Sequence, residues 1–90
     1  TASWGLIGFI WGRPVAQFVI RPQRYTREFV DREERATLSF FSPEYRAALE
    51  YCGSRTGVGD KIRNAGLTVA CTDDGVPAPA EARLILQCRK

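Results

Sequence analysis

The segment Arg21-Pro22-Gln23-Arg24-Tyr25-Thr26 lies between an apolar run, residues 14–20, and a helical pattern that begins at Arg27. Pro22 fixes its own backbone and favours extended geometry at Arg21, so a strand is expected to end here in a rigid turn. Thr26 is expected to be the N-cap of the helix, because its hydroxyl can accept a hydrogen bond from an unpaired amide.

This turn has two interpretations. Arginine side chains bind phosphate through paired hydrogen bonds, and the amides at a helix N-terminus favour an anion. Arg21, Arg24, Tyr25 and Thr26 would then form an anion site. The alternative is a strand-to-helix turn with solvated arginines, and the residue spacing alone leaves both interpretations open.

The residues before this turn predict a β-hairpin. Residues 2–11 have the pattern of a first strand, 12–14 that of a turn and 15–20 that of a second strand. The first strand is apolar on both faces, which indicates burial on two sides or strong curvature around Gly5 and Gly8. These glycines have a second interpretation, in which they let a flat ligand approach the backbone.

The residues after the turn predict short helices over 27–33, 43–52 and 60–65, and strands over 36–41, 68–73 and 82–88. Gly53 is expected to end the second helix as a left-handed cap. Asp74-Gly75 is expected to form a turn, and Pro77 and Pro79 to keep the segment after it irregular. Five strands with short helical insertions predict a mainly β fold, an antiparallel β-barrel.

Length and composition limit the class of protein. The chain has 90 residues and is 44% hydrophobic, which predicts one small folded domain. It contains no apolar run of about 20 residues and no visible signal peptide, so we expect no membrane partner. The chain lacks methionine, and its last predicted strand reaches the final residues. We therefore expect the domain, residues 1–90, to be truncated at both ends.

The three cysteines and the absence of histidine argue against a metal site and against a Cys-His nucleophile. Cys52 and Cys88 fall on inward-facing positions and are expected to be packing thiols, kept reduced in the cytoplasm. The net charge of +3 fits an anionic ligand but is too small to argue for nucleic acid.

The glycine-rich segment 54–61 does not match the phosphate-binding loop of nucleotide triphosphatases, because Ile62 stands where that loop needs a hydroxyl. Two interpretations remain open for this segment. It either supplies amides and Lys61 to an anion or is a plain connector.

Several short motifs, in order along nearly the whole chain, carry a resemblance to a known family. They are Thr1-Ala2-Ser3-Trp4-Gly5, Trp11-x-Arg13-Pro14, Arg21-Pro22-x-Arg24-Tyr25-Thr26-x-Glu28-Phe29, Thr37-Leu38-Ser39-Phe40-Phe41, Glu44-Tyr45-Arg46-x-Ala48-Leu49, Cys52-Gly53, Asp60-Lys61, Ala65-Gly66-Leu67-Thr68 and Glu81-Ala82-x-Leu84-x-Leu86-x-Cys88. As an ordered set they resemble the flavin reductase-like family, which includes the flavoredoxins.

The resemblance implies an FMN-binding split β-barrel, usually a homodimer with the flavin at the subunit interface. It also implies electron transfer between a reduced donor such as NAD(P)H and an acceptor. No catalytic residue is assigned, because the flavin carries the redox chemistry. The positions that match flavin-binding residues are Thr1, Ser3 and Trp4 along the ring and ribityl chain, Arg21, Arg24, Tyr25 and Thr26 at the phosphate, and Ser54 and Lys61 in the glycine-rich segment.

Two other function classes stay open beside a flavin-dependent oxidoreductase. One is a barrel that binds flavin or another small ligand without turnover, and the other is a barrel that binds nucleic acid through stacked aromatics and arginines. Trp4 and Trp11 are each expected either to border the flavin ring or, more often in so small a domain, to belong to the core. A second subunit is expected to cover the face of the first strand that points away from the barrel interior.

Overall fold

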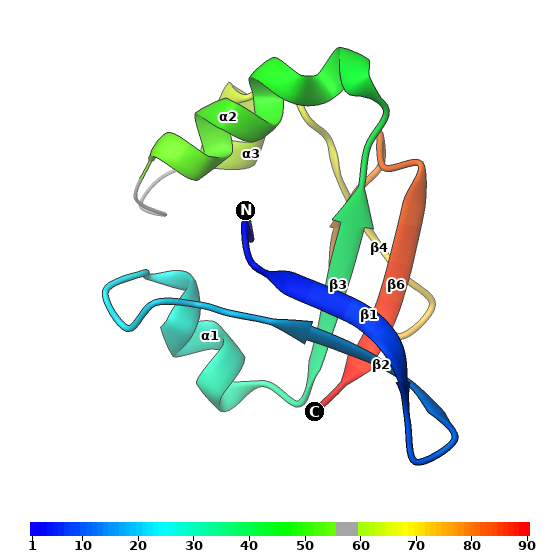
Figure 1. Ribbon diagram of the computed structural model, residues 1–90. Helices are drawn as coiled ribbons and strands as arrows, with labels where there is room; N and C mark the ends of the chain where they lie inside the picture. Colours follow the sequence, from blue (N-terminus) through cyan, green and yellow to red (C-terminus); the bar gives the residue numbers. More distant parts are fainter. Residues whose placement is uncertain (56–59) are drawn as a thin grey trace.

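The computed structural model describes residues 1–55 and 60–90 and contains six strands and four short helices (Figure 1). In chain order they are β1 (Gly5–Ile10), β2 (Arg13–Phe18), α1 (Thr26–Arg32), β3 (Arg35–Phe40), the 3-10 helix η1 (Pro43–Tyr45), α2 (Arg46–Ser54), α3 (Lys61–Asn64), β4 (Val69–Cys71), β5 (Pro77–Pro79) and β6 (Leu84–Arg89).

The first two strands form the predicted antiparallel hairpin. Gly5 pairs with Phe18 and Ile10 pairs with Arg13, so the loop consists of Trp11 and Gly12 alone. Both loop residues have positive φ, 55° at Trp11 and 71° at Gly12, as a two-residue type I′ turn requires. The prediction that residues 12–14 form the turn is wrong by about one residue, because Trp11 adopts a left-handed conformation and Arg13 already belongs to β2.

The two glycines of β1 have different surroundings. A Cβ added at Gly5 would lie 2.4 Å from the carbonyl oxygen of Gln17, so the paired strand itself requires glycine there. A Cβ added at Gly8 would meet no atom within 4 Å. Close backbone approach within the hairpin therefore explains Gly5, and nothing in the structure explains Gly8.

The other four strands form two more antiparallel pairs. Arg35 pairs with Arg89 and Phe40 with Leu84 in the β3–β6 sheet, and Ala70 pairs with Ala78 in the β4–β5 sheet. The prediction of an irregular segment at 77–79 is wrong. The amides of Ala78 and Ala80 face β4, and the two prolines occupy the alternate positions, where no ladder bond needs an N–H.

The strands form three separate two-stranded sheets, and the described residues form no closed barrel. In Figure 1 the β1–β2 hairpin runs across the β3–β6 sheet, with α2 and α3 at one end and α1 near the chain's C-terminus. The predicted mainly β, antiparallel class with short helical insertions is confirmed. The finer prediction of an FMN-binding split barrel stays a prediction.

Two helix boundaries differ from the sequence-based predictions. Tyr25, not Thr26, occupies the N-cap position of α1, and its side chain makes no capping bond. Gly53 lies inside α2 and is not among the residues with positive φ, so it does not end the helix as a left-handed cap. The cap at Asp60 is confirmed, because its carboxylate accepts a hydrogen bond from the amide of Arg63 at 3.4 Å.

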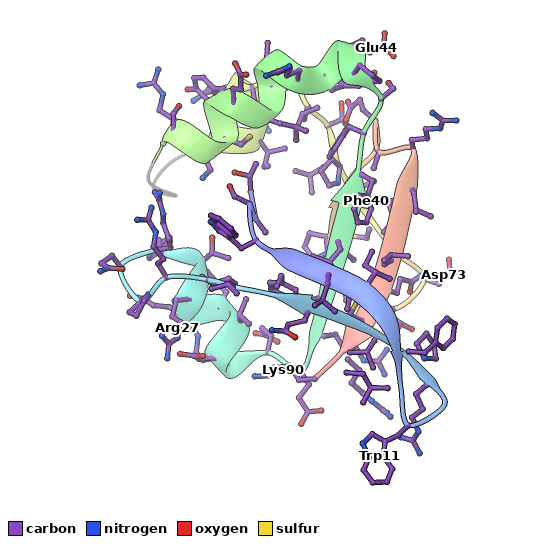
Figure 2. The ribbon with its side chains drawn as sticks, in the orientation of Figure 1. Trp11, Arg27, Phe40, Glu44, Asp73 and Lys90 are labelled. Carbon is purple, nitrogen blue, oxygen red and sulfur yellow. The ribbon has the colours of Figure 1, made fainter. Side chains whose placement is uncertain are left out.

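The hydrophobic core of the described chain is small. Its buried hydrophobic residues are Cys52, Leu67 and Ala78, whereas Phe9 is 80% exposed and Trp11 is 96% exposed at the tip of the hairpin (Figure 2). The accessible surface is 7240 Å², against roughly 5,300 Å² expected for a compact monomer of this mass. The fold therefore leaves more surface exposed than a compact monomer does, and four of its exposed large hydrophobic side chains, Leu6, Ile7, Phe9 and Ile10, belong to β1.

The cysteines differ in burial. Cys52 is buried, as predicted, Cys88 is half-buried and Cys71 is exposed, and all three are reduced. The prediction of a packing thiol is thus confirmed for Cys52 and only partly fulfilled at Cys88. No helix within residues 1–55 and 60–90 is long and apolar enough to cross a bilayer.

Candidate functional site

The N-terminal residues lie against the last turn of α2. A Cβ added at Gly53 would come within 2.6 Å of the Thr1 hydroxyl oxygen, so the two residues are in direct contact. In Figure 1 the N-terminus lies between the α2–α3 helix pair and the loop that precedes α1. Residues from the start and the middle of the chain are thereby brought together.

Lys61, at the start of α3, binds the C-terminal end of α2. Its Nζ donates to the carbonyl oxygens of Cys52 at 2.9 Å and of Arg55 at 3.1 Å. Carbonyl groups at a helix C-terminus lack partners within the helix and carry partial negative charge, so a lysine there is stabilising. Two of the three ammonium donors are used in this way, which leaves one for a ligand.

Charged residues from two other segments of the chain affect the pKa of the Thr1 amino group. Burial is the main cause that lowers the pKa of the Thr1 amino group below its ordinary value, and the positive charge of Lys61 lowers it further. Cys52 acts in the opposite direction, and Arg24 adds to the lowering. Lys61 in α3 and Arg24 in the turn before α1 therefore both act on the Thr1 amino group.

The turn that contains Arg24 is closed by the backbone. The amide of Arg24 donates to the carbonyl of Arg21 at 3.0 Å, and the amide of Arg27 donates to the carbonyl of Arg24, also at 3.0 Å. Arg21 and Arg24 are both exposed, so their guanidinium groups are accessible to a ligand. The predicted contribution of the helix N-terminus is weak, because α1 has seven residues and its early amides are already bonded.

The other two predicted site residues of this turn, Tyr25 and Thr26, lie at the start of α1. The ring of Tyr25 packs edge-to-face on that of Phe29, with 5.0 Å between centroids. Thr26 is the first residue of α1 and is exposed. Both lie beside Arg24 in sequence, but no contact ties either side chain to Thr1 or Lys61 within the described part of the chain.

Ser54 and Arg55 lie where α2 ends, next to Lys61. The Ser54 hydroxyl donates to the carbonyl of Tyr51 at 3.0 Å and keeps its lone pairs for another donor. The guanidinium of Arg55 lies over the Tyr51 ring, 4.8 Å from its centroid. Arg55 was not among the predicted site residues, although its place in the glycine-rich segment was a signal for it. The glycines predicted to supply amides, at positions 57 and 59, lie outside the described residues.

Ser3 and Trp4 connect Thr1 to β1. Both are exposed, and the carbonyl of Trp4 accepts a hydrogen bond from the amide of Val19 at 3.1 Å, which extends the hairpin ladder. The Trp4 side chain is 76% exposed. The alternative that Trp4 and Trp11 belong to the core is therefore wrong, and the indole of Trp4 is open to a flat ligand.

An open, shallow cleft of about 470 Å³ lies between β2 and α1, and its lining includes Arg27 and Lys90, which are labelled in Figure 2. None of the predicted site residues lines it. Its charged side chains are occupied, because Arg27 pairs with Asp31 at 2.9 Å and the Nζ of Lys90 donates to the carbonyl of Val30 at 2.7 Å. We therefore place the candidate site at Thr1, Arg24 and Lys61, which we call the basic cluster, and not in this cleft.

Comparison of the chain with protein-family models, with curated proteins and with solved structures found no match. Over residues 1–55 and 60–90, no group of three or more His, Cys, Asp or Glu residues is placed to hold a metal ion. The chemistry of the basic cluster is that of anion binding, since it combines a guanidinium, an ammonium group and a hydroxyl. This donor set fits a phosphate group.

Proposed function

We propose that the chain is a flavoprotein of the flavin reductase type, which binds FMN and transfers electrons between a donor such as NAD(P)H and an acceptor. The observation that carries the proposal is the basic cluster itself. The charges of Lys61 and Arg24, from two segments distant in sequence, both act on the Thr1 amino group, and the Thr1 hydroxyl lies against Gly53 in α2, whereas the indole of Trp4, three residues further along the chain, is exposed. A phosphate group and a flat aromatic ring are the two ends of FMN that such an arrangement suits.

The residues have distinct roles in this proposal. Arg24 would hold the phosphate through paired charge-assisted hydrogen bonds, and Lys61 would add its remaining ammonium donor. The resemblance places Thr1 along the ring and ribityl chain, but its position near Lys61 favours a contact of its hydroxyl with the phosphate end, while Trp4 would border the ring. Arg21 and Ser54 are accessible beside these groups. When bound, the flavin supplies the redox chemistry, while the protein binds, orients and shields it.

The proposal includes a homodimer. The surface of the chain exceeds that of a compact monomer by about 2,000 Å², which is within the range that each subunit of an obligate dimer buries. Four of the exposed large hydrophobic side chains, Leu6, Ile7, Phe9 and Ile10, lie on β1. A second copy packed there would cover β1 and provide the other wall for the flavin ring.

The test compares FMN with riboflavin, which has the same ring system but no phosphate. Arg24→Ala is expected to raise the Kd for FMN tenfold or more and to leave that for riboflavin nearly unchanged, since a hydrogen bond to a charged group contributes about 1.5–3 kcal/mol. Arg46→Ala is the matched control, because Arg46 pairs with Glu50 on the exposed face of α2. Equal weakening of both ligands by Arg24→Ala contradicts the proposal.

A binding protein without turnover is the second candidate. The basic cluster contains cations and hydroxyl donors, and nothing in it requires that the bound flavin be reduced. Anaerobic addition of NADPH to the FMN complex separates the two candidates. Bleaching of the flavin absorption near its visible maximum supports the oxidoreductase, and an unchanged spectrum supports the binding protein.

A further inference from the structure

We propose that Gly53 is a positioning residue of the candidate FMN site, because its missing side chain makes room for the Thr1 hydroxyl. The inference rests on the proposed function, and it assigns to this glycine a role other than ending a helix. In this role Gly53 lets Thr1 lie against the end of α2, to which Lys61 is bonded.

Helix geometry does not explain a glycine at this position. Gly53 lies inside α2 and is not among the residues with positive φ. Glycine inside a helix is less favourable than alanine, so this residue makes α2 less stable than alanine would. A reason outside the helix is therefore needed.

The contact with Thr1 provides that reason. A Cβ at position 53 would lie 2.6 Å from the Thr1 hydroxyl oxygen, but 3.8 Å from the Thr1 Cβ and 4.0 Å from its Cγ2. Only the hydroxyl oxygen is closer than van der Waals contact allows. An alanine would force this hydroxyl to leave its place, either by rotation of the side chain or by movement of the N-terminal residues.

The location of the contact makes such a movement relevant to the site. The carbonyl of Cys52, one residue before Gly53, is a bonding partner of Lys61. Thr1 is three residues before Trp4, whose carbonyl is already fixed to β2. Gly53 thus lies where the N-terminal residues meet the end of α2 that Lys61 binds.

The test is Gly53→Ala, with Arg46→Ala as the matched control, since Arg46 belongs to the same helix and pairs with Glu50 on its exposed face. Gly53→Ala is expected to weaken FMN binding about tenfold, the loss of one hydrogen bond to a charged group. Its urea midpoint is expected to equal or exceed that of the wild type, because alanine favours the helix. Arg46→Ala is expected to leave the Kd for FMN unchanged.

A double-mutant cycle with Thr1→Ala shows whether the effect passes through Thr1. If it does, Thr1→Ala and the double variant bind FMN equally. Wild-type affinity of Gly53→Ala, or additive losses in the double variant, would overturn the inference. Absence of FMN binding by the wild type would refute the proposed function instead. The amide resonances of Ser3 and Trp4 then still decide the positioning role, since Gly53→Ala shifts them if it is correct and leaves them unchanged if it is not.

Discussion

Replacement of Lys61 by methionine isolates the role of its ammonium group, because methionine keeps most of the apolar stem. The variant loses two hydrogen bonds to the end of α2, one part-buried to Cys52 and one exposed to Arg55. A bond to a charged group contributes about 1.5–3 kcal/mol, and the exposed one much less. Lys61→Met is therefore expected to lower the free energy of unfolding by about 2 kcal/mol.

The assay is thermal and urea unfolding followed by circular dichroism. In a domain of this size each kcal/mol shifts the Tm by about 4–8 °C, so a decrease of about 8–16 °C is expected for Lys61→Met. Arg63→Met is the control, because Arg63 lies in the same helix and makes only an exposed ion pair with Asp60 at 3.1 Å. An unchanged Tm for Lys61→Met, or equal decreases for both variants, would refute the assignment of Lys61 as the residue that binds the end of α2.

Three further predictions concern a carboxylate, the cysteines and the dimer. The backbone amide of Thr68 donates to both carboxylate oxygens of Glu81, and these bonds lower the pKa of Glu81. The ionised Glu81 therefore stabilises the fold at pH values above its ordinary pKa, and this stabilisation is lost as the pH falls through the lowered pKa. Glu81→Gln should make urea stability less dependent on pH below about 4.5, and an identical dependence contradicts this. Brief alkylation of the native protein, followed by mass spectrometry, should show fast modification of Cys71 and slow modification of Cys52. Fast modification of Cys52 would contradict its burial in the fold. Light scattering over a concentration series should detect a dimer that Trp11→Ser weakens, whereas a wild-type monomer that still binds FMN refutes the dimer.

Local patterns in the sequence were sufficient to predict most elements. The hairpin of β1 and β2 and the separate strands β3 and β6 follow from alternating or apolar runs bounded by turn residues, whereas the pairing of β3 with β6 was not predicted. The short β5 could not be predicted in this way, because proline usually argues against a strand. Its two prolines are compatible with pairing only because both fall on positions whose amides would face away from β4, which depends on the register.

The candidate site was only partly predictable from sequence. Arg24 and Lys61 could be named from their turn and loop, because arginine and lysine in such segments suit anions. Their convergence on Thr1 depends on how α2 and the hairpin pack, which no local pattern determines. The role of Gly53 was misread for the same reason, since a glycine near a predicted helix end indicates a cap unless the residue that lies against it is known.

The central claim is that the basic cluster binds the phosphate of FMN, and equilibrium titration of the purified wild-type chain tests it most directly. Flavin fluorescence and visible absorption are followed while FMN, and separately riboflavin, is titrated against the protein. We predict saturable FMN binding with one flavin per chain and an affinity at least about tenfold higher than that for riboflavin, as expected for charge-assisted bonds to a phosphate. Equal affinities for the two flavins, or no spectral change with either, would contradict the claim.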